Sequence, residues 1–559
     1  MLHLDNHRLV AETRTLSAIF EDGRLISLRS RLTDDSFLLP EAASKEAPLY
    51  VVYPSGQAVP IGGPGATISY HQHSDWRVDI TIQDWEGDGL ITISEQRETG
   101  ELLIEPSVFT THPGVLACRW SLAGIAENLQ LVAPFYQGSK LALDDPLIAR
   151  TRWEWPVLWE AALAILQGQD AGFWVHTRDT RALPKSLQVG SETQKQMLGF
   201  DSETPGPVDD NLSAGGFIWR LNVYQGDWTV PAGSYRDWLW QAYNLKQRQE
   251  ARPAWMQDVT LAFTWCESDP AFLDALAQKV KPSHTLLHLA HWRTDPYDEN
   301  YPTFEPSPEA KLFVAKGKQM GFHIFPHMNP IDMDPTHPYY QRVNHFQYRD
   351  IHSKRVLGWA WDEQNHTMKN VPASPQSLFS NRHKKVMVKI HPGASFWRSL
   401  LIEQVHHALN ELQHDCTFLD VTLATQNVVN SMVEQRTPTL GMLELLDMAG
   451  ELNNGIVLGG EGLNEMTMQS LSFAQAHLFR SAARSIEGLE RAGGCPLNAF
   501  LFSGLSRTIG YTNISGKNED QEMRHRVHVS LGAIPTLSEL SVEEILHPNA
   551  FVQHIFNTV

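Results

Sequence analysis

The sequence is poor in cysteine, in basic charge and in long apolar runs. Its four cysteines, Cys118, Cys266, Cys416 and Cys495, stand far apart without a CxxC pair, so neither a disulfide framework nor a zinc ribbon is predicted. The 64 Asp and Glu residues outnumber the 45 Lys and Arg residues, and the net charge of −19 argues against nucleic acid or an anionic membrane as a partner. No run of 18 apolar residues and no secretory signal is visible, so we expect a cytoplasmic protein.

The composition is that of an ordinary globular protein. Of the 559 residues, 42% are apolar, which is enough to bury a core. The sequence pattern changes near residue 250. We predict a multidomain α+β protein with a large antiparallel β-sandwich and a connecting helix over residues 1–250. A (β/α)8 barrel of the TIM type would follow over residues 251–559.

The first half shows short alternating runs of apolar and polar residues, separated by Gly, Pro, Asp and Asn, as is typical of antiparallel strands. Eight such strands are predicted, over residues 24–32, 48–54, 76–85, 89–96, 101–111, 115–124, 171–179 and 215–226. Two longer patterns, 155–167 and 235–249, predict helices, and the second of these would connect the two domains.

From residue 258 apolar runs alternate with amphipathic helices, which indicates a parallel α/β arrangement. The predicted strands cover residues 259–265, 284–292, 321–329, 416–422, 455–462 and 499–504, and residues 526–532 are a candidate for one more. The predicted helices cover residues 270–280, 308–320, 396–412, 440–450 and 468–485. A doubly wound sheet is the alternative, but no GxGxxG or Walker sequence follows the first strand.

One stretch, from about residue 330 to 395, is long and irregular in pattern and is rich in aromatic residues and histidines. Excursions of this length after a barrel strand are usually functional, and this one would lie over the C-terminal mouth of the barrel. A decorated surface loop is the alternative.

Two carboxylates at predicted strand ends carry the strongest chemical signal. Alternation along residues 416–422 places Asp420 on the same, inward face as Phe418. Glu461 ends the next strand, between Gly460 and Gly462, which would allow a ligand to approach closely. Both would converge on the C-terminal face of the barrel, where catalytic groups gather. Two converging carboxylates suit glycoside hydrolysis, although such residues also cap helices or pair with arginine.

Other polar and aromatic residues follow the predicted strands and could contact a sugar through ring stacking or directed hydrogen bonds. The candidate substrate-binding residues are Trp265, His291, Trp292, Asp298, Tyr301, His327 and Asn329. The alternative is that most of these aromatic side chains belong to the core. We expect no metal site at His284, His288 and His291, because on a strand they do not share one face.

The barrel half resembles the retaining α-glycosidase superfamily. It is similar to the endo-α-N-acetylgalactosaminidases of glycoside hydrolase families 101 and 129 and to related uncharacterised bacterial proteins. The resemblance rests on the segments HWRTDPYDENYPTFEP, GFHIFPHMN, HPGASFWRSLLIEQV, CTFLDVT and VLGGEG, in this order and after an N-terminal sandwich. It implies that Asp420 is the nucleophile and Glu461 the general acid/base, and that Asp298 and Asn329 contact the sugar.

Glu465 lies four residues after Glu461 and could compete for the acid/base role. A helix beginning near Leu463 would instead make Glu465 a first-turn residue that the helix dipole stabilises. The end of the predicted strand favours Glu461.

Together these features predict a retaining glycoside hydrolase that cleaves an α-linked sugar from a small oligosaccharide or glycoside. This mechanism requires neither a metal nor an organic cofactor. One alternative is a carbohydrate-binding protein that has kept the fold and lost the chemistry. Another is a lyase built on the sandwich, which would need a Tyr or His base beside a charge-neutralising group. The sequence is compatible with a homo-oligomer and does not name the sugar.

Overall fold

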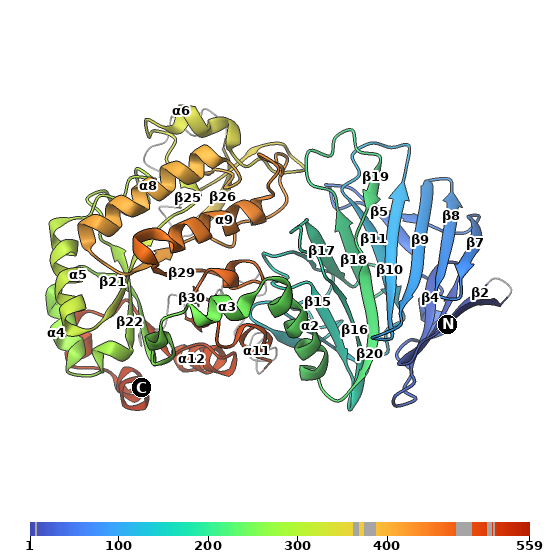
Figure 1. The fold of residues 1–559 in the computed structure, drawn as a ribbon, viewed down its shortest axis with the longest axis horizontal. Coiled ribbons are helices and arrows are strands. Elements are labelled where there is room, and N and C mark those ends of the chain that lie inside the picture. Colours follow the sequence, from blue (N-terminus) through green and yellow to red (C-terminus); the bar gives the residue numbers. More distant parts are fainter. Residues whose placement is uncertain (6–7, 362–367, 374–386, 477–494, 511–516, 518–519) are drawn as a thin grey trace. The chain divides into compact units, whose positions relative to one another are not determined.

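In the computed structural model the chain forms two compact units, residues 1–242 and 243–559 (Figure 1). The structure describes residues 1–5, 8–361, 368–373, 387–476, 495–510, 517 and 520–559. Within these ranges no helix is both long and apolar enough to cross a membrane.

The first unit consists of antiparallel sheets. A four-stranded sheet has the order β1 (Leu2–Asp5), β2 (Arg8–Glu12), β3 (Leu16–Glu21), β4 (Arg24–Ser30). A ten-stranded sheet has the order β13 (Ser139–Ala142), β12 (Gln130–Ala133), β15 (Leu163–Gln167), β16 (Ala171–Thr177), β20 (Trp219–Gln225), β10 (Glu101–Phe109), β9 (Gly87–Gln96), β8 (Arg77–Asp84), β7 (Thr67–Ser74), with β19 (Ser213–Gly215) also paired to β10. A six-stranded sheet has the order β14 (Arg152–Glu154), β17 (Lys185–Val189), β18 (Met197–Glu203), β11 (Ala117–Ala123), β5 (Leu49–Val52), β6 (Ala58–Ile61).

The core of this unit joins the six-stranded and ten-stranded sheets. Trp120 and Phe200, from the six-stranded sheet, stack at 5.5 Å between ring centroids. Phe200 in turn lies 5.2 Å from the ring of Trp219 on β20. The Trp219 indole N–H donates to Ser202 Oγ at 3.2 Å, so this buried ring has a polar partner. Two layers that share one apolar core form the sandwich expected from the alternating pattern.

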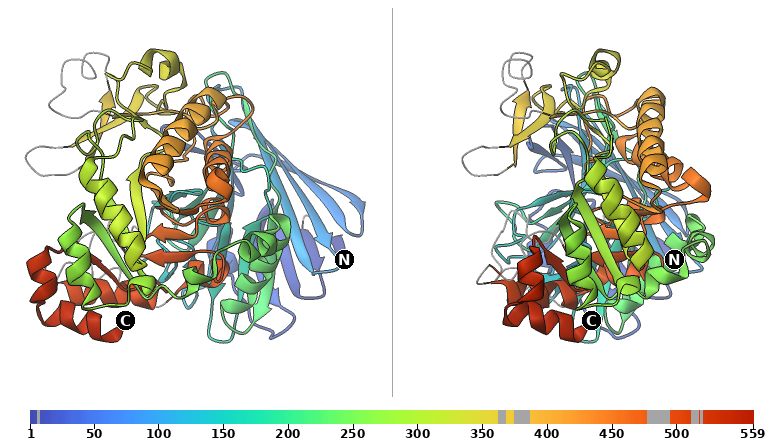
Figure 2. Two further views of the ribbon diagram at one scale, coloured as in Figure 1. Left: turned by 60° about the vertical axis from the view of Figure 1, so that its left-hand side comes forward. Right: turned by 90° about the vertical axis from the view of Figure 1, so that its left-hand side faces the viewer.

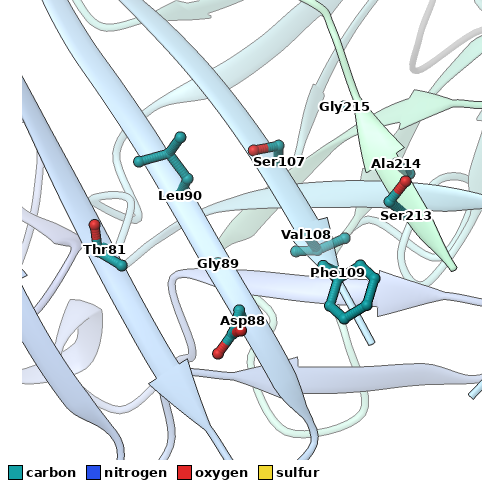
Figure 3. A pocket seen from close by; sticks show the side chains of 10 residues that line it. All are labelled: Thr81, Asp88, Gly89, Leu90, Ser107, Val108, Phe109, Ser213, Ala214 and Gly215. Carbon is teal, nitrogen blue, oxygen red and sulfur yellow. The ribbon is translucent and has the colours of Figure 1, made fainter. Parts of the chain in front are cut away.

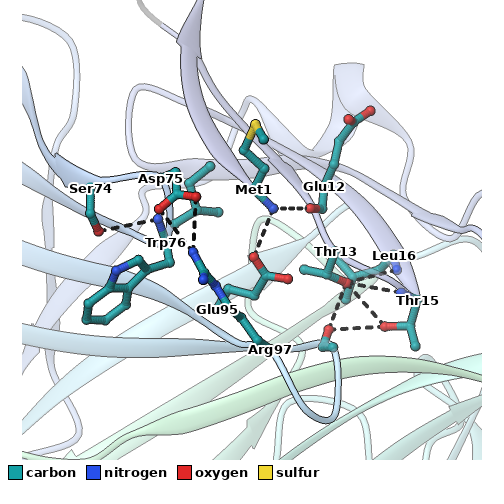
Figure 4. A network of polar contacts seen from close by, with 12 residues as sticks. Met1, Glu12, Thr13, Thr15, Leu16, Ser74, Asp75, Trp76, Glu95 and Arg97 are labelled. Atoms are coloured by element: carbon teal, nitrogen blue, oxygen red, sulfur yellow. Dashed lines mark hydrogen bonds and ion pairs between the residues drawn. The ribbon is translucent and has the colours of Figure 1, made fainter.

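The start of the chain is fastened to the β7–β9 part of the ten-stranded sheet (Figure 4). The Met1 amino group lies 2.8 Å from Glu95 on β9 and also donates to the carbonyl of Glu12 on β2. Arg97, just beyond β9, pairs with Asp75 at 3.0 Å. The Met1 contacts connect the β1–β2 hairpin to the β7–β9 meander, and the Arg97–Asp75 pair braces the meander itself.

All eight strands predicted in the first half are present, but the helix predicted over residues 155–167 is wrong. Residues Leu163–Gln167 form β15, and every residue of this strand is buried. A strand buried on both faces reads as a continuous apolar run and resembles a buried helix in sequence. The single connecting helix predicted over 235–249 is two helices, α2 (Thr229–Ala242) and α3 (Leu245–Glu250), interrupted at Asn244 by a left-handed φ of 52°.

The second unit is built on eight parallel strands. Their order is β21 (Leu261–Glu267), β22 (Thr285–His291), β23 (His323–Met328), β28 (Cys416–Leu419), β29 (Val457–Glu461), β30 (Phe473–Gln475), β31 (Arg507–Ile509) and then β32 (Thr536–Ser538), which pairs with β21. A parallel bridge between Ile509 and Ile534 joins β31 to the residues that lead into β32. This bridge nearly closes the sheet into the expected barrel.

Helices cover the outside of this barrel, and neighbours in sequence pack against each other (Figures 1 and 2). They are α4 (Pro270–Ala277), α5 (Pro308–Met320), α8 (Ser395–Leu412), α9 (Pro438–Gly450) and α13 (Val542–Leu546), followed by α14 (Ala550–Thr558). The starts of α4, α5 and α9 combine a proline in the first turn with a side-chain cap from Asp269, Ser307 and Thr437, respectively. A proline in the first turn and a capping side chain mark the start of a helix, and they made these helices predictable from the sequence.

The predictions for the last barrel strands are wrong. Residues 499–504, predicted as a strand, belong mostly to α11 (Leu497–Phe502), and residues 526–532 overlap α12 (Gln521–Ser530). The helix predicted over 468–485 is interrupted by β30, and its part from residue 477 lies outside the described residues. The true strands β30, β31 and β32 have three residues each, which is too short to produce a recognisable period.

The stretch after β23 is more regular than its sequence suggests. It contains α6 (Tyr340–Val343) and an antiparallel sheet with the order β24 (Asp332–Met333), β27 (Met387–Lys389), β25 (Val356–Trp361), β26 (Met368–Ala373). Its own small core gathers around Met333, Val343, Val388, Ile390 and Trp397 of the following helix α8.

The barrel interior explains which side chains reach its C-terminal mouth. Its apolar cluster includes Leu286, Phe325, Phe418, Val457 and Phe473, one from each of five neighbouring strands. Because side chains alternate along a strand, positions two or four residues further on face the same interior. These positions hold His288, His327, Asp420, Glu461 and Gln475.

Candidate active site

Asp420 and Glu461 stand at the carboxyl ends of adjacent strands. Asp420 directly follows β28, and its backbone N–H continues the ladder by donating to the Met328 carbonyl at 2.8 Å. Its side chain is 15% exposed. Glu461 is the last residue of β29 and is only 3% exposed. The Asp420 carboxylate is therefore partly exposed at the mouth of the barrel, whereas the Glu461 carboxylate is enclosed.

A short loop after Asp420 holds Glu461 in place. The Val421 N–H donates to Oε2 of Glu461 at 3.0 Å. The Thr422 hydroxyl donates to the Glu461 carbonyl at 2.7 Å and accepts from the Glu461 N–H at 3.0 Å. Both the side chain and the backbone of Glu461 are thus fixed by the two residues that follow Asp420.

The glycines beside Glu461 are required for packing and conformation. A Cβ on Gly460 would lie 2.6 Å from Leu471 and 3.0 Å from the Thr422 hydroxyl. Gly462 has φ +73°, a conformation that side chains disfavour. The expectation that these glycines open the site to a ligand has no support in these contacts, because protein atoms already occupy the space.

Several residues at this end of the barrel have left-handed backbone conformations that are rare outside glycine, and three of them belong to the candidate site. They are Trp265 (φ 61°), Asp298 (φ 59°) and Val421 (φ 55°). The β-branched Val421 is the most costly of the three. Such strain persists where surrounding contacts enforce it, and it concentrates at functional sites.

Trp265 is turned into the mouth by an irregularity in β21. The register between β21 and β22 shifts between Phe263 and Cys266, and Trp265 lies in this bulge. Its ring centroid is 5.4 Å from His288, 5.5 Å from Tyr297 and 5.9 Å from His327. Trp265 and Tyr297 are half-buried, so this aromatic group offers ring surface at the mouth.

The two histidines of this group are buried and bonded to each other. His288 Nε2 lies 3.0 Å from His327 Nδ1. On its other side, His327 Nε2 lies 3.3 Å from the Tyr297 hydroxyl and 3.7 Å from Asp420 Oδ2. Burial lowers the pKa of His288 to about 3, with His291 adding to the effect, and burial also lowers the pKa of His327 well below 6.5. Both rings are therefore neutral at neutral pH.

The loop after β22 brings Asp298 and Tyr301 to the same region. The Tyr301 hydroxyl donates to Asp298 Oδ1 at 3.2 Å, and both residues are buried. Burial raises the pKa of Tyr301 well above 10, and the charges of Asp298 and Asp420 raise it further. Arg293 organises the loop from within by donating to the carbonyls of residues 296, 299 and 303.

Three other predicted substrate-binding residues have different surroundings. Trp292 is 1% exposed, and its indole N–H donates to the His327 carbonyl at 2.7 Å. Asn329 is also 1% exposed, and its amide nitrogen donates to Asp332 Oδ2 at 2.8 Å while its oxygen accepts from the Asp332 N–H. His291 is exposed at the rim, 5.5 Å from the Tyr297 ring. Trp292 and Asn329 therefore support the strand ends from within.

Glu465 is buried like Glu461, but the helix expected to begin near Leu463 is absent at that point. The short 3-10 turn η6 begins at Thr467 and ends at Gln469. Asn464 shapes the approach, with its side-chain oxygen accepting from the backbone of residues 466 and 467. The helix-dipole argument against Glu465 is therefore wrong, although Glu461 remains the residue at the strand end.

Sequence reasoning missed three residues of the site. The sequence pattern suggests His288 only as a possible metal ligand, and nothing in it distinguishes Tyr297 beside Asp298. Gln475 was hidden in a predicted helix, yet it pairs in register with Glu461 on the adjacent strand and is 1% exposed. Its Nε2 has no hydrogen-bond partner within the described parts of the chain. The 5.4 Å contact between His288 and Trp265 has no signature in sequence, because it depends on the bulge.

The first unit holds no comparable constellation among its described residues. Its Glu101–His176 pair (3.1 Å), with Arg220 at 2.9 Å from Glu101, is closed to substrate because Glu101 and His176 are 2% and 0% exposed. A cavity of about 520 Å³ lies over β8, β9 and β10, with Phe109, Leu90 and Ser107 in its wall and Asp88 as its one carboxylate (Figure 3). Neither feature joins a base to a neutralising group that a polymer could reach, so the lyase alternative has no support.

Comparison with known proteins gives the fold a context. Residues 216–434 match a family described only as a domain of unknown function (DUF6259). This match includes Asp420 and ends before Glu461. A search of curated protein sequences finds no match.

Solved structures match over the whole chain. The ligand-free α-N-acetylgalactosaminidase NagBb from Bifidobacterium bifidum has a TM-score of 0.64 at 12% identity, covering 100% of this chain and 93% of that one. The GalNAc complex of NagBb gives a TM-score of 0.63 at the same identity and coverage. The chain shares the fold of NagBb. The GH36 α-galactosidase AgaB from Geobacillus stearothermophilus is more distant, with a TM-score of 0.50 at 9% identity over 100% of this chain and 86% of that one.

Proposed function

We propose that this protein is a retaining α-glycosidase with Asp420 as nucleophile and Glu461 as general acid/base. The observation that carries the proposal is the 3.0 Å bond from the Val421 N–H to Glu461 Oε2, which brings the second carboxylate to the residue next to Asp420. Two carboxylates on adjacent strands at a barrel mouth are the minimum apparatus for double displacement. The fold shared with NagBb supports the same assignment.

In the first step an oxygen of Asp420 bonds to the anomeric carbon as the glycosidic bond breaks. Glu461 gives its proton to the departing oxygen. In the second step Glu461 takes a proton from water, the water oxygen bonds to the anomeric carbon, and the bond to Asp420 breaks. The unequal surroundings of the two groups suit these roles, because Asp420 is 15% exposed at the mouth and Glu461 is enclosed.

The proposed substrate is a small glycoside that ends in α-linked N-acetylgalactosamine, with an α-galactoside as the second candidate. The fold similarity to NagBb and AgaB, named for these two activities, supports this choice. In an α-glycoside of N-acetylgalactosamine the acetamido group lies on the same side of the ring as the leaving group. The substrate cannot attack its own anomeric carbon from behind, so a protein carboxylate must do so.

Sugar contacts are assigned to the aromatic and polar groups around Asp420. Trp265 and Tyr297 offer half-buried rings on which a sugar face can stack. Asp298, held by Tyr301, supplies a carboxylate for hydroxyl groups. Gln475 supplies an amide beside Glu461 whose Nε2 lacks a partner in the described structure.

The test is hydrolysis of a panel of aryl α- and β-glycosides followed by proton NMR of the first-formed anomer. We expect one α-glycoside to be cleaved with the α-anomer appearing first, and we expect Asp420→Asn to lose this activity. Glu465→Gln is the matched control for Glu461→Gln, because both positions are buried carboxylates four residues apart. Loss of turnover in Glu465→Gln but not in Glu461→Gln would reverse the acid/base assignment.

Azide rescue separates the two roles. With Asp420→Gly, azide can attack the substrate directly, and we expect the β-glycosyl azide. With Glu461→Ala and an activated aryl leaving group, azide should release the glycosyl-enzyme as the α-glycosyl azide. An absence of turnover with every glycoside, combined with saturable binding of N-acetylgalactosamine, would instead identify a carbohydrate-binding protein that has lost the chemistry.

A further inference from the structure

Two hydrogen bonds run from the backbone of β21 to His327, and a contact of 3.7 Å continues from His327 to the carboxylate of Asp420. The first bond begins at the Trp265 N–H, which donates to Nδ1 of His288 at 3.2 Å. Trp265 sits in the bulge of β21 with a left-handed φ of 61°, which directs this N–H toward a side chain. Since Nδ1 of His288 accepts a hydrogen bond, it carries no proton, and the neutral ring must carry its proton on Nε2.

The second hydrogen bond fixes the tautomer of the next ring, that of His327. His288 Nε2 lies 3.0 Å from Nδ1 of His327. With the proton on His288, His327 Nδ1 is the acceptor, and its own proton must lie on Nε2. Both rings are buried, and burial keeps both neutral, so each ring carries one proton. The tautomer of each ring is therefore defined.

The third contact reaches the reacting group. His327 Nε2 faces Asp420 Oδ2 at 3.7 Å and the Tyr297 hydroxyl at 3.3 Å. His327 Nε2 therefore presents an N–H, and not a lone pair, to both groups: the Tyr297 hydroxyl lies within hydrogen-bond distance, and the carboxylate lies just beyond it. A neutral donor can orient a carboxylate without the full charge of a cation, which would draw electron density from a nucleophile. Contacts that become hydrogen bonds in the reacting complex are often longer before substrate binds.

We propose that His288 and His327 are positioning residues, which hold Asp420 for attack through a tautomer order set by the Trp265 backbone N–H. The inference rests on the proposed function, since it assigns a role relative to Asp420 as nucleophile. It differs from the sequence prediction for His327, which was substrate contact. Both ring nitrogens of His327 already face protein groups, and its side chain is 2% exposed.

The decisive comparison is between His288→Leu and His288→Gln. The glutamine amide can still donate to Nδ1 of His327, whereas leucine cannot, so only the leucine variant allows His327 to turn a lone pair toward Asp420. We expect kcat for the aryl α-glycoside to fall at least about 100-fold in His288→Leu and less than about tenfold in His288→Gln, with KM nearly unchanged in both.

The pH profile gives a readout that mere loss of packing would not change. The groups that face His327 are His288, His291, Arg293, Tyr297, Asp420 and Glu461. Loss of the N–H donor disfavours the anionic carboxylate, so the acidic limb of kcat/KM against pH should move to higher pH in His288→Leu and stay in place in His288→Gln. His414→Leu is the control for packing, because His414 is also a buried histidine but bonds Thr417 at the other end of β28.

A measurement that needs no activity protects the test against variants that fail to fold. In wild-type protein labelled with 15N-histidine, ring nitrogen shifts should report the Nε2–H tautomer for both His288 and His327, assigned by their glutamine variants. An Nδ1–H tautomer or a cation at His327 near pH 7 would overturn the inference.

The outcomes also separate this inference from the proposed function. If Asp420→Asn keeps full turnover, the proposed nucleophile is wrong. If Asp420→Asn abolishes turnover while His288→Leu retains kcat and its pH profile, the nucleophile stands and the positioning chain is refuted.

Discussion

The N–H of Val421, the residue that follows Asp420, donates to Oε2 of Glu461 across 3.0 Å. To make this bond Val421 adopts a left-handed φ of 55°, which β-branched residues rarely tolerate. Backbone strain thus appears at the single residue that joins the two carboxylates. The strained conformation points the Val421 N–H dipole at the Glu461 carboxylate. It also fixes the direction in which the backbone continues from Asp420.

Val421→Gly relieves this strain at the cost of a half-buried side chain and a freer backbone. We expect the free energy of unfolding to change by less than about 1 kcal/mol, because these effects oppose each other. We expect kcat to fall about threefold to tenfold, since the loop no longer holds the carboxylates in one arrangement. Urea denaturation and steady-state kinetics measure the two quantities.

Gln413→Gly is the matched control for this prediction. Gln413 ends α8 with the same φ of 55° but is exposed, so glycine there should stabilise the fold and leave kcat unchanged. A Val421→Gly protein destabilised by more than about 2 kcal/mol would mean that the valine side chain, and not its backbone conformation, is what the site needs.

Thr422→Val should lower both the free energy of unfolding and kcat. The Thr422 hydroxyl bonds both the N–H and the carbonyl of Glu461, and valine would remove both of these bonds from buried groups. The expected loss is about 1–3 kcal/mol in the free energy of unfolding, with a fall of about tenfold or more in kcat as the Glu461 backbone shifts.

Thr425→Val tests the same substitution three residues further along. The Thr425 hydroxyl is buried and has no hydrogen-bond partner in the described structure, so valine should be neutral or stabilising. Equal stability losses in the two variants would show that the contacts of Thr422 with Glu461 are not what stabilises this loop.

The barrel and the strand-end carboxylates could be predicted because their physical signals are local. Strands β21, β22 and β23 are long apolar runs, and the helices between them begin with proline and a capping side chain. Alternation along β28 then sufficed to direct Asp420 inward, on the face of Phe418.

The rest of the site depends on contacts that no local pattern encodes. The bulge that turns Trp265 toward His288 arises from the register between two strands. Gln475 ends a three-residue strand within a stretch that reads as helix, so its position beside Glu461 follows from barrel closure alone. The two glycines around Glu461 were visible in the sequence, but the neighbours Leu471 and Leu423 that explain them are distant in it.

Gln475→Leu should separate function from stability. The variant removes a buried amide whose nitrogen lacks a partner in the described structure, so the free energy of unfolding should stay constant or rise by up to about 1 kcal/mol. Catalytic efficiency should instead decrease, because a sugar contact is lost, and kcat/KM for the aryl α-glycoside should fall about tenfold. Gln469→Leu is the contrast, because the Gln469 amide donates to the Glu465 carbonyl and its loss should destabilise. Unchanged kcat/KM in Gln475→Leu would remove Gln475 from the sugar site.

The protein should lose stability on mild acidification, before its carboxylates titrate. Burial lowers the pKa of His288, His414 and His528 to about 3 and that of His176 and His391 to about 4. The unfolded chain binds protons at these sites near pH 6.5, and the folded chain does not. Stability is therefore complete above about pH 6.5 and decreases as the pH falls toward the folded values. Glu101, with a pKa lowered to about 2, adds its loss only below about pH 4.5.

His414→Gln isolates one of these groups. Glutamine can keep a hydrogen bond to the Thr417 hydroxyl, as His414 Nε2 does at 3.1 Å, but it cannot take up a proton. Between pH 6 and pH 4 the free energy of unfolding should then fall less steeply than in the wild type, by up to about 1.4 kcal/mol per pH unit. Urea denaturation at pH 7, 6, 5 and 4 provides the slopes. Parallel slopes for the two proteins would mean that His414 already binds its proton in the folded state, and burial would then not be the dominant influence on this ring.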